Sequence, residues 1–162
     1  MLWRAIAETK DLAAFRQEFP YYFLVGQVAL HRPPRAMATI SLDVVTLAGL
    51  PPAPTQPATY LTLPVKKNQS TLASMISVGR TANNDLVIED VQISKFHALF
   101  RVRGDVLALE DAGSVNGTKV GNVMLVKGQP HGVRSGDRIA FGSVEFKLLD
   151  SGDAWHALRA ML

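Results

Sequence analysis

The chain has 162 residues, of which 48% are hydrophobic and 19% charged, so it can bury a core and lacks the composition of a disordered protein. Its formal net charge of +3 is small, and no dense run of lysine and arginine indicates a nucleic-acid-binding surface. The absence of cysteine excludes disulfides, thiolate catalysis and cysteine-ligated metals, and the four scattered histidines lack the spacing of a metal site.

The first 50 residues are predicted to form an extension made of one helix and two strands. Residues 1–19 repeat apolar side chains every three or four positions, which favours a helix that ends before Pro20. Residues 21–30 are aromatic and branched, and residues 40–44 alternate apolar and polar side chains, so each stretch predicts a strand. We expect this extension to dock on the domain that follows it or on a partner, because so few elements seldom stand alone.

Residues 51–57, PPAPTQP, contain four prolines and predict a stiff linker at a domain boundary. Residues 58–149 then alternate short apolar stretches with turn-forming residues, which is typical of an all-β sandwich. Residues 150–162 are predicted to be a tail, with a short helix over residues 155–162. The predicted strands of the sandwich are 60–65, 75–78, 86–88, 96–102, 106–109, 118–120, 123–126, 137–141 and 144–149.

No uncharged stretch of about 18 to 20 apolar residues occurs, and the first turns carry charges in place of a signal-peptide apolar core. We therefore expect a soluble cytoplasmic protein that binds neither a membrane nor nucleic acid. No feature of the sequence requires a metal or another cofactor, and the oligomeric state is left open.

Three loops of the predicted sandwich concentrate polar and turn-forming residues, and the loops at one end of such a fold usually carry its binding site. They are VGRTANND at 78–85, ISKFHA at 93–98 and DAGSVNGTKV at 111–120. Their order and spacing resemble the forkhead-associated (FHA) domain family over about residues 58–149. The matching residues are Gly79-Arg80, Ser94 and His97, Asn116-Gly117-Thr118, and the closing Gly136-Asp137-x-Ile139-x-Phe141-Gly142.

This resemblance implies an antiparallel sandwich of about eleven strands that binds phosphothreonine peptides through these loops. It assigns Arg80 and Ser94 to the phosphate, with Lys95 as an added charge, and Asn116 to the peptide backbone. These roles suit their chemistry, because a phosphate ester needs fixed cationic and hydroxyl donors. Each residue also has a plain structural alternative, such as a surface cation or a hydroxyl that closes a loop.

The position before Asn116 holds Val115, where many family members carry a threonine that also reaches the phosphate. Loss of that hydrogen bond should weaken binding by about 0.5 to 1.5 kcal/mol, and the backbone N–H of Val115 is expected to remain available to the ligand. Gln92 is the candidate for reading neighbouring residues of the peptide.

Four further residues are expected to be structural at the site. The resemblance assigns His97 to a hydrogen bond between loops, and Gly79 is expected to lend Arg80 flexibility. Gly117 suits a turn with positive φ, and Thr118 is also expected to be structural.

The sequence also allows two other functions to be considered. A catalytic Ser94–His97 pair lacks an acid partner and a Gly-x-Ser-x-Gly turn, so no catalytic residue and no enzyme is predicted. The expected function is a signalling adaptor that recruits a threonine-phosphorylated protein, a substrate or regulator of a Ser/Thr kinase. The alternative is a phosphate-independent assembly scaffold that acts through Trp3, Phe15 and Phe19 of the N-terminal extension.

Overall fold

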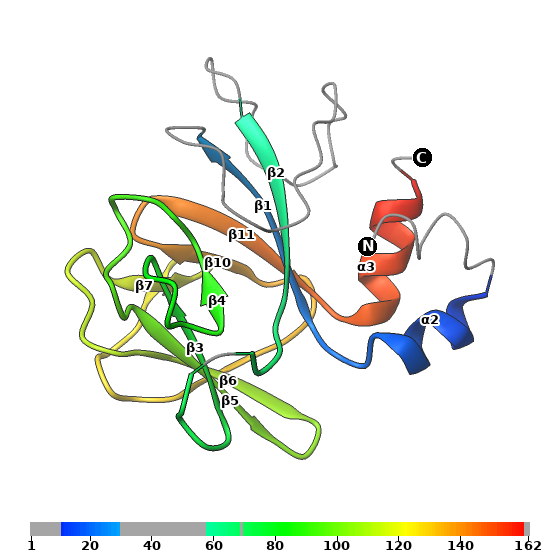
Figure 1. Ribbon diagram of the computed structural model, residues 1–162, viewed down its shortest axis with the longest axis horizontal. Helices are drawn as coiled ribbons and strands as arrows, with labels where there is room; N and C mark the ends of the chain where they lie inside the picture. Colours follow the sequence, from blue (N-terminus) through cyan, green and yellow to red (C-terminus); the bar gives the residue numbers. More distant parts are fainter. Residues whose placement is uncertain (1–10, 30–57, 69, 161–162) are drawn as a thin grey trace.

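The computed structural model describes residues 11–29, 58–68 and 70–160, which form a two-layer β-sandwich with a pair of helices beside it (Figure 1). One sheet has six strands and the other has five. In spatial order the first sheet contains β2 (Ala58–Pro64), β1 (Phe23–Ala29), β11 (Val144–Leu149), β10 (Arg138–Phe141), β7 (Thr118–Val120) and β8 (Val123–Met124). The second contains β4 (Leu86–Val87), β3 (Met75–Gly79), β5 (Ala98–Arg103), β6 (Val106–Asp111) and β9 (His131–Val133).

The predicted eleven-strand sandwich is confirmed, with two local differences in the second sheet. The β3–β4 pair is parallel, whereas the other strand pairs with a known register are antiparallel. Strand β9 was missed, because three residues with a central glycine show no alternation of apolar and polar side chains. Its place in the sheet comes from pairing with β6, which is a contact between residues distant in the sequence.

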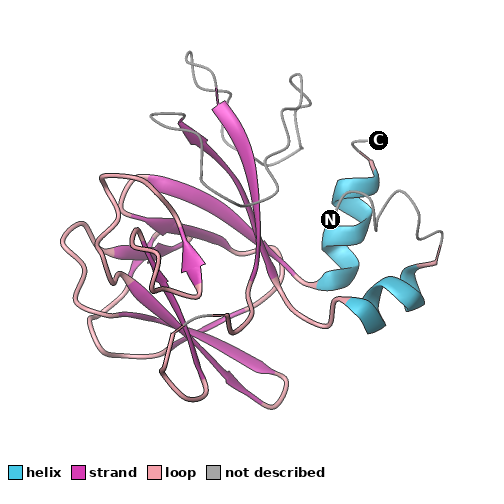
Figure 2. Cartoon of the chain, in the orientation of Figure 1, coloured by secondary structure: helices cyan, strands magenta, loops and turns pink. Residues whose placement is uncertain are grey.

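Strands form the sandwich, and the two helices stand beside it (Figure 2). The core between the sheets is built by side chains that alternate along the strands. Phe100, Phe141 and Phe146 are each at most 2% exposed and lie in one cluster with aliphatic residues of both sheets. The rings of Phe141 and Phe146 lie 6.0 Å apart. The loops that join the strands therefore project from a rigid body.

Strand β1 is part of this sandwich, although it precedes the proline-rich residues 51–57 in the sequence. It pairs with β2 on one side and with β11 on the other. This corrects the placement of residues 21–30 in a separate extension: the prolines lie between two neighbouring strands of one sheet. The predicted strand at 40–44 and the linker itself fall outside the described residues.

Helices α2 (Leu12–Glu18) and α3 (Ser151–Arg159) lie beside the start of β1 and the end of β11, and they pack against Phe23, Val25 and Leu149 (Figure 1). Helix α3 begins four residues earlier than predicted, because the Asp150 side chain accepts a hydrogen bond from the Asp153 N–H at 2.9 Å and so caps the first turn. No helix in the described segments is both long and apolar enough to cross a bilayer.

The helix pair buries the aromatic side chains that the assembly alternative requires to be exposed. Phe15 is 0% exposed and packs with Phe23 and Ala154 in a second apolar cluster. Phe19 is half-buried, with its ring 4.8 Å from that of Phe15. Phe15 is therefore a core residue and Phe19 packs against that core, whereas Trp3, the third member of the proposed contact, lies outside the described residues.

Candidate functional site

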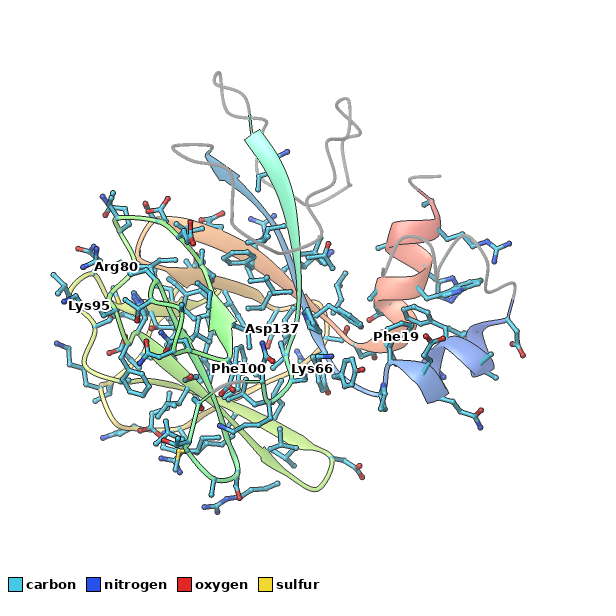
Figure 3. All side chains as sticks on the ribbon, viewed as in Figure 1. Phe19, Lys66, Arg80, Lys95, Phe100 and Asp137 are labelled. Carbon is cyan, nitrogen blue, oxygen red and sulfur yellow. The ribbon has the colours of Figure 1, made fainter. Side chains whose placement is uncertain are left out.

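Loops from both sheets meet at the end of the sandwich away from the helices and surround an open depression of about 430 Å³. Figure 3 shows Arg80 and Lys95 at this end, whereas Phe19 lies at the other, beside the helices. The structure therefore brings together all six residues predicted to contact a ligand. The depression is lined by Arg80, Val91, Gln92, Ile93, Ser94, Lys95, Phe96, Gly113, Val115 and Asn116.

Two cations stand on the rim of the depression. Arg80 and Lys95 are both exposed, and neither forms an ion pair with any carboxylate of the described residues. The backbone N–H of Arg80 donates to the Ser94 carbonyl at 3.1 Å, which ties the two loops together. The loops that carry these two charges are thus joined through the backbone, and the charges form no ion pair within the described part of the chain.

The hydroxyl of Ser94 faces the loop that contains Val115 and is hydrogen-bonded to that loop. Ser94 Oγ accepts a hydrogen bond from the Val115 N–H at 3.0 Å. The Val115 N–H is therefore engaged within the protein, which differs from the expectation that it would be left for a ligand. Since Ser94 Oγ accepts this bond, its own hydrogen remains to be donated. The Val115 side chain is 88% exposed.

Asn116 and Gln92 meet across the depression. The Asn116 side-chain nitrogen donates to the Gln92 carbonyl at 2.8 Å and to the Gln92 side-chain oxygen at 3.2 Å. Gln92 is itself positioned by its N–H, which donates to the Asp90 carboxylate at 2.8 Å. Asn116, which is assigned to the peptide backbone, is therefore hydrogen-bonded to Gln92, which is assigned to peptide selectivity.

His97 is fully buried and its ring joins two loops. Nδ1 accepts from the Ser94 backbone N–H at 3.0 Å, so the ring proton lies on Nε2, which donates to the Gly117 carbonyl at 3.0 Å. The ring also lies edge-on to Phe141, with centroids 5.5 Å apart. Because Nδ1 is bonded to the backbone of Ser94 and not to its hydroxyl, the geometry is not that of a nucleophile and its base.

Acidification should weaken the fold through His97. Burial lowers the pKa of His97 below its usual value, against the smaller opposing effects of the Gly117 hydrogen bond and the Asp111 charge. The unfolded chain then binds more protons than the folded one, so the free energy of unfolding falls as pH drops below about 6.5. We expect urea unfolding between pH 7.5 and 5.5 to show this loss, and a His97→Gln variant to show a flatter profile. Equal slopes for the two proteins would contradict it, and an exposed-residue variant, His156→Gln, serves as the control.

Gly79 is explained by close packing of backbone. A Cβ atom at this position would overlap the Lys95 carbonyl oxygen. The same oxygen accepts hydrogen bonds from the Asn84 side chain at 2.7 Å and from the Thr81 hydroxyl at 2.9 Å. Gly79 therefore allows the Arg80 loop and the Lys95 loop to lie against each other, which is a steric reason and not the flexibility that was expected.

Asp111 organises the third loop and was missed from the sequence. One carboxylate oxygen accepts from the N–H groups of Gly113 and Ser114, and the other accepts from the hydroxyls of Ser114 and Thr118 at 2.6 Å. Burial raises the pKa of Asp111, but these hydrogen bonds together outweigh burial and hold it below its usual value. The spacing of Asp111 and Ser114 is that of a side chain bonded to the backbone two and three residues ahead, and this spacing could have revealed it.

The turn that Asp111 supports presents Asn116. Gly117 has a φ of +81°, the left-handed region that the Asn-Gly pair predicts. Its N–H donates to the Ser114 hydroxyl at 2.9 Å. The Thr118 side chain is fully buried and bonded to Asp111, so Gly117 and Thr118 lie beneath the depression while Asn116 is exposed on its rim.

A second buried carboxylate, Asp85, holds the loop before β3. It accepts from the backbone N–H groups of Asn68, Ser70 and Ser77 at 2.7 to 2.9 Å. Lys67 Nζ lies 3.1 Å from it. Burial raises the pKa of Asp85, but the hydrogen bonds outweigh this effect and lower it well below its usual value. In the described segments, no group of three or more histidine and carboxylate side chains is arranged to hold a metal ion.

Residues 76–142 match the model of the FHA domain family. The chain is similar to Protein FraH of Nostoc sp., with 38% identity over 78 residues, which are 43% of this chain and 26% of that protein. It is also similar to the glycogen accumulation regulator GarA of Mycolicibacterium smegmatis, with 43% identity over 44 residues, which are 27% of this chain and 28% of that protein. The matches span little more than a quarter of either relative.

Among solved structures, the chain is similar to the FHA domain of the CT664 protein from Chlamydia trachomatis. The TM-score is 0.50 and the sequence identity 19%, over 80% of this chain and 97% of that one. At this identity the likeness supports the fold of the sandwich.

Proposed function

From the forkhead-associated domain that this chain contains over residues 76–142, we propose that the chain binds phosphothreonine peptides in the depression between Arg80, Ser94, Lys95 and Asn116. The observation that carries this proposal is the convergence of two exposed cations and a hydroxyl on one open surface with no carboxylate partner among the described residues. A phosphate monoester carries a charge of about −1.5 to −2 and three acceptor oxygens, which such a surface can bind.

Each residue has a distinct part in the proposed complex. The Arg80 guanidinium can donate two parallel hydrogen bonds to the phosphate, and Lys95 adds a second positive charge at the rim. Ser94 donates its hydroxyl hydrogen while its oxygen holds the Val115 N–H. Val115 offers no hydroxyl, so the site binds the phosphate with one hydrogen bond fewer than a threonine there would allow.

The biological role that follows is that of an adaptor. An FHA domain is a protein-interaction module, and we propose that this one recruits a protein that a Ser/Thr kinase has phosphorylated on threonine, without catalysis or a cofactor. The partner is a substrate or a regulator of that kinase. Because such phosphorylation uses ATP, we place the encounter in the cytoplasm.

One peptide in three forms tests the proposal. We expect the phosphothreonine form to bind in isothermal titration calorimetry, the unmodified form not to bind measurably, and the phosphoserine form to bind less tightly. The loss of one buried methyl accounts for about 0.8 kcal/mol, or roughly fourfold, of the last difference. Affinity should also fall as salt is raised. Equal binding of the phosphorylated and unmodified forms would refute the proposal.

A further inference from the structure

The side-chain amide of Asn116 has only one orientation that its neighbours permit. Its nitrogen lies 2.8 Å from the Gln92 main-chain carbonyl, a group that can only accept a hydrogen bond, so the NH₂ end must face Gln92. The second N–H is directed to the Gln92 side-chain oxygen at 3.2 Å. Both donors of Asn116 are thus used within the protein, and the group that remains for a ligand is the acceptor, Oδ1.

Gly142, in the turn between β10 and β11, lies directly beneath this pair. Its φ is +60° and its N–H donates to the Gly117 carbonyl at 2.9 Å. A Cβ atom at position 142 would lie 2.9 Å from the Gln92 carbonyl oxygen and 3.2 Å from the Asn116 Cβ. The missing side chain of Gly142 therefore leaves the space in which the Gln92 carbonyl and the Asn116 amide approach each other.

We propose that Gly142 and Gln92 are positioning residues that turn Asn116 Oδ1 toward the ligand, so that full affinity requires an N–H donor from the ligand in addition to a phosphate. The inference rests on the proposed function and adds a second requirement to it. We call Gln92, Asn116 and Gly142 the amide clasp. A main-chain N–H beside the phosphothreonine meets this requirement, and phenyl phosphate, which is a phosphate monoester without any N–H group, does not.

Gly142→Ala tests the clasp against a matched glycine. Gly104, in the β5–β6 turn, also has a φ of +60°, but nothing lies within 4 Å of a Cβ added there. Gly104→Ala therefore introduces the same backbone strain without crowding the clasp. We expect Gly142→Ala to bind a phosphothreonine peptide about five- to tenfold more weakly than wild type, the effect of one neutral hydrogen bond. Gly104→Ala should bind it as wild type does, and both variants should bind phenyl phosphate unchanged.

A set of N-methylated phosphothreonine peptides identifies the donor. In wild type, methylation of the one amide that Asn116 reads should weaken binding about five- to tenfold, and the same methyl group should cost Gly142→Ala little. Gln92→Met, which keeps the length of the side chain but removes its amide, is a second variant at an exposed position outside the core. It should move the Asn116 side-chain NH₂ resonances in a ¹⁵N–¹H spectrum and weaken binding of the peptide, but not of phenyl phosphate, about twofold or more.

The results separate this inference from the function on which it rests. If wild type binds the peptide and Gly142→Ala binds it equally well, the clasp is overturned and the proposed function stands. If Gly142→Ala loses affinity for the peptide and for phenyl phosphate to the same degree, Gly142 supports the whole site and the inference is also overturned. If wild type binds neither probe, the proposed function fails, and the inference fails with it.

Discussion

Replacing Arg80 with alanine should strongly weaken the binding of a phosphothreonine peptide. Removal of one partner from a charged hydrogen-bonded pair costs about 2 to 5 kcal/mol, which is about 30-fold to several-thousand-fold in Kd. We expect a loss near the lower end, because Arg80 is exposed and the depression is open to solvent. Arg80→Lys should recover part of the affinity, since lysine keeps the charge but not the planar pair of donors.

Calorimetry with the Arg80 variants needs a control for net charge, and Arg103 supplies it. Arg103 is exposed and lies at the end of β5, next to the β5–β6 turn and outside the depression. Arg103→Ala changes the net charge by the same amount and should leave Kd nearly unchanged. If Arg80→Ala binds as tightly as wild type, or if the two alanine variants lose equal affinity, the phosphate is not bound at Arg80.

Replacing Asp85 with alanine should lower the free energy of unfolding by about 3 to 5 kcal/mol, the effect of leaving buried partners of a removed charge unsatisfied. Its side chain is 0% exposed and accepts hydrogen bonds from three backbone N–H groups. Asp85→Asn should cost less, because one acceptor oxygen remains. Urea unfolding at pH 7 measures both changes, with the exposed Glu89→Ala as the control for loss of a carboxylate.

The Asp85 carboxylate also makes the free energy of unfolding depend on pH. Because the pKa of Asp85 is lower in the folded chain than in the unfolded chain, its contribution is present above about pH 4 and is lost as the pH falls toward the folded-state value. Asp85→Asn should therefore show a weaker loss of stability below pH 4 than wild type. An unchanged free energy of unfolding in Asp85→Ala would contradict this account, because it would show that the N–H groups of Asn68 and Ser70 do not depend on the Asp85 carboxylate.

The sequence predicts those parts of the site whose geometry is determined by a few neighbouring residues. The turn at Asn116-Gly117 follows from local backbone preferences, and Gly117 indeed adopts positive φ. The contacts between loops follow from the folded sandwich alone. The Ser94 hydroxyl meets Val115 from a loop about 20 residues away, so no local pattern could show that the Val115 N–H is engaged.

The misplaced boundary has a comparable physical cause. Prolines cannot join the interior of a sheet, which is why residues 51–57 were interpreted as a division between domains. Prolines are equally compatible with a long connection between two paired strands, and the pairing of β1 with β2 is a contact across that connection. Sequence patterns locate strands, but their neighbours in a sheet depend on the whole chain.

The pairing of Ala29 with Ala58 has a practical consequence. These two residues end β1 and begin β2, at the end of two strands that extend beyond the part of β1 paired with β11 (Figure 1). The entropy of closing a flexible connection between two such adjacent points grows by only about 0.6 kcal/mol for each doubling of its length. Truncation of the chain up to residue 57 would, by contrast, remove β1, the strand that joins β2 to β11.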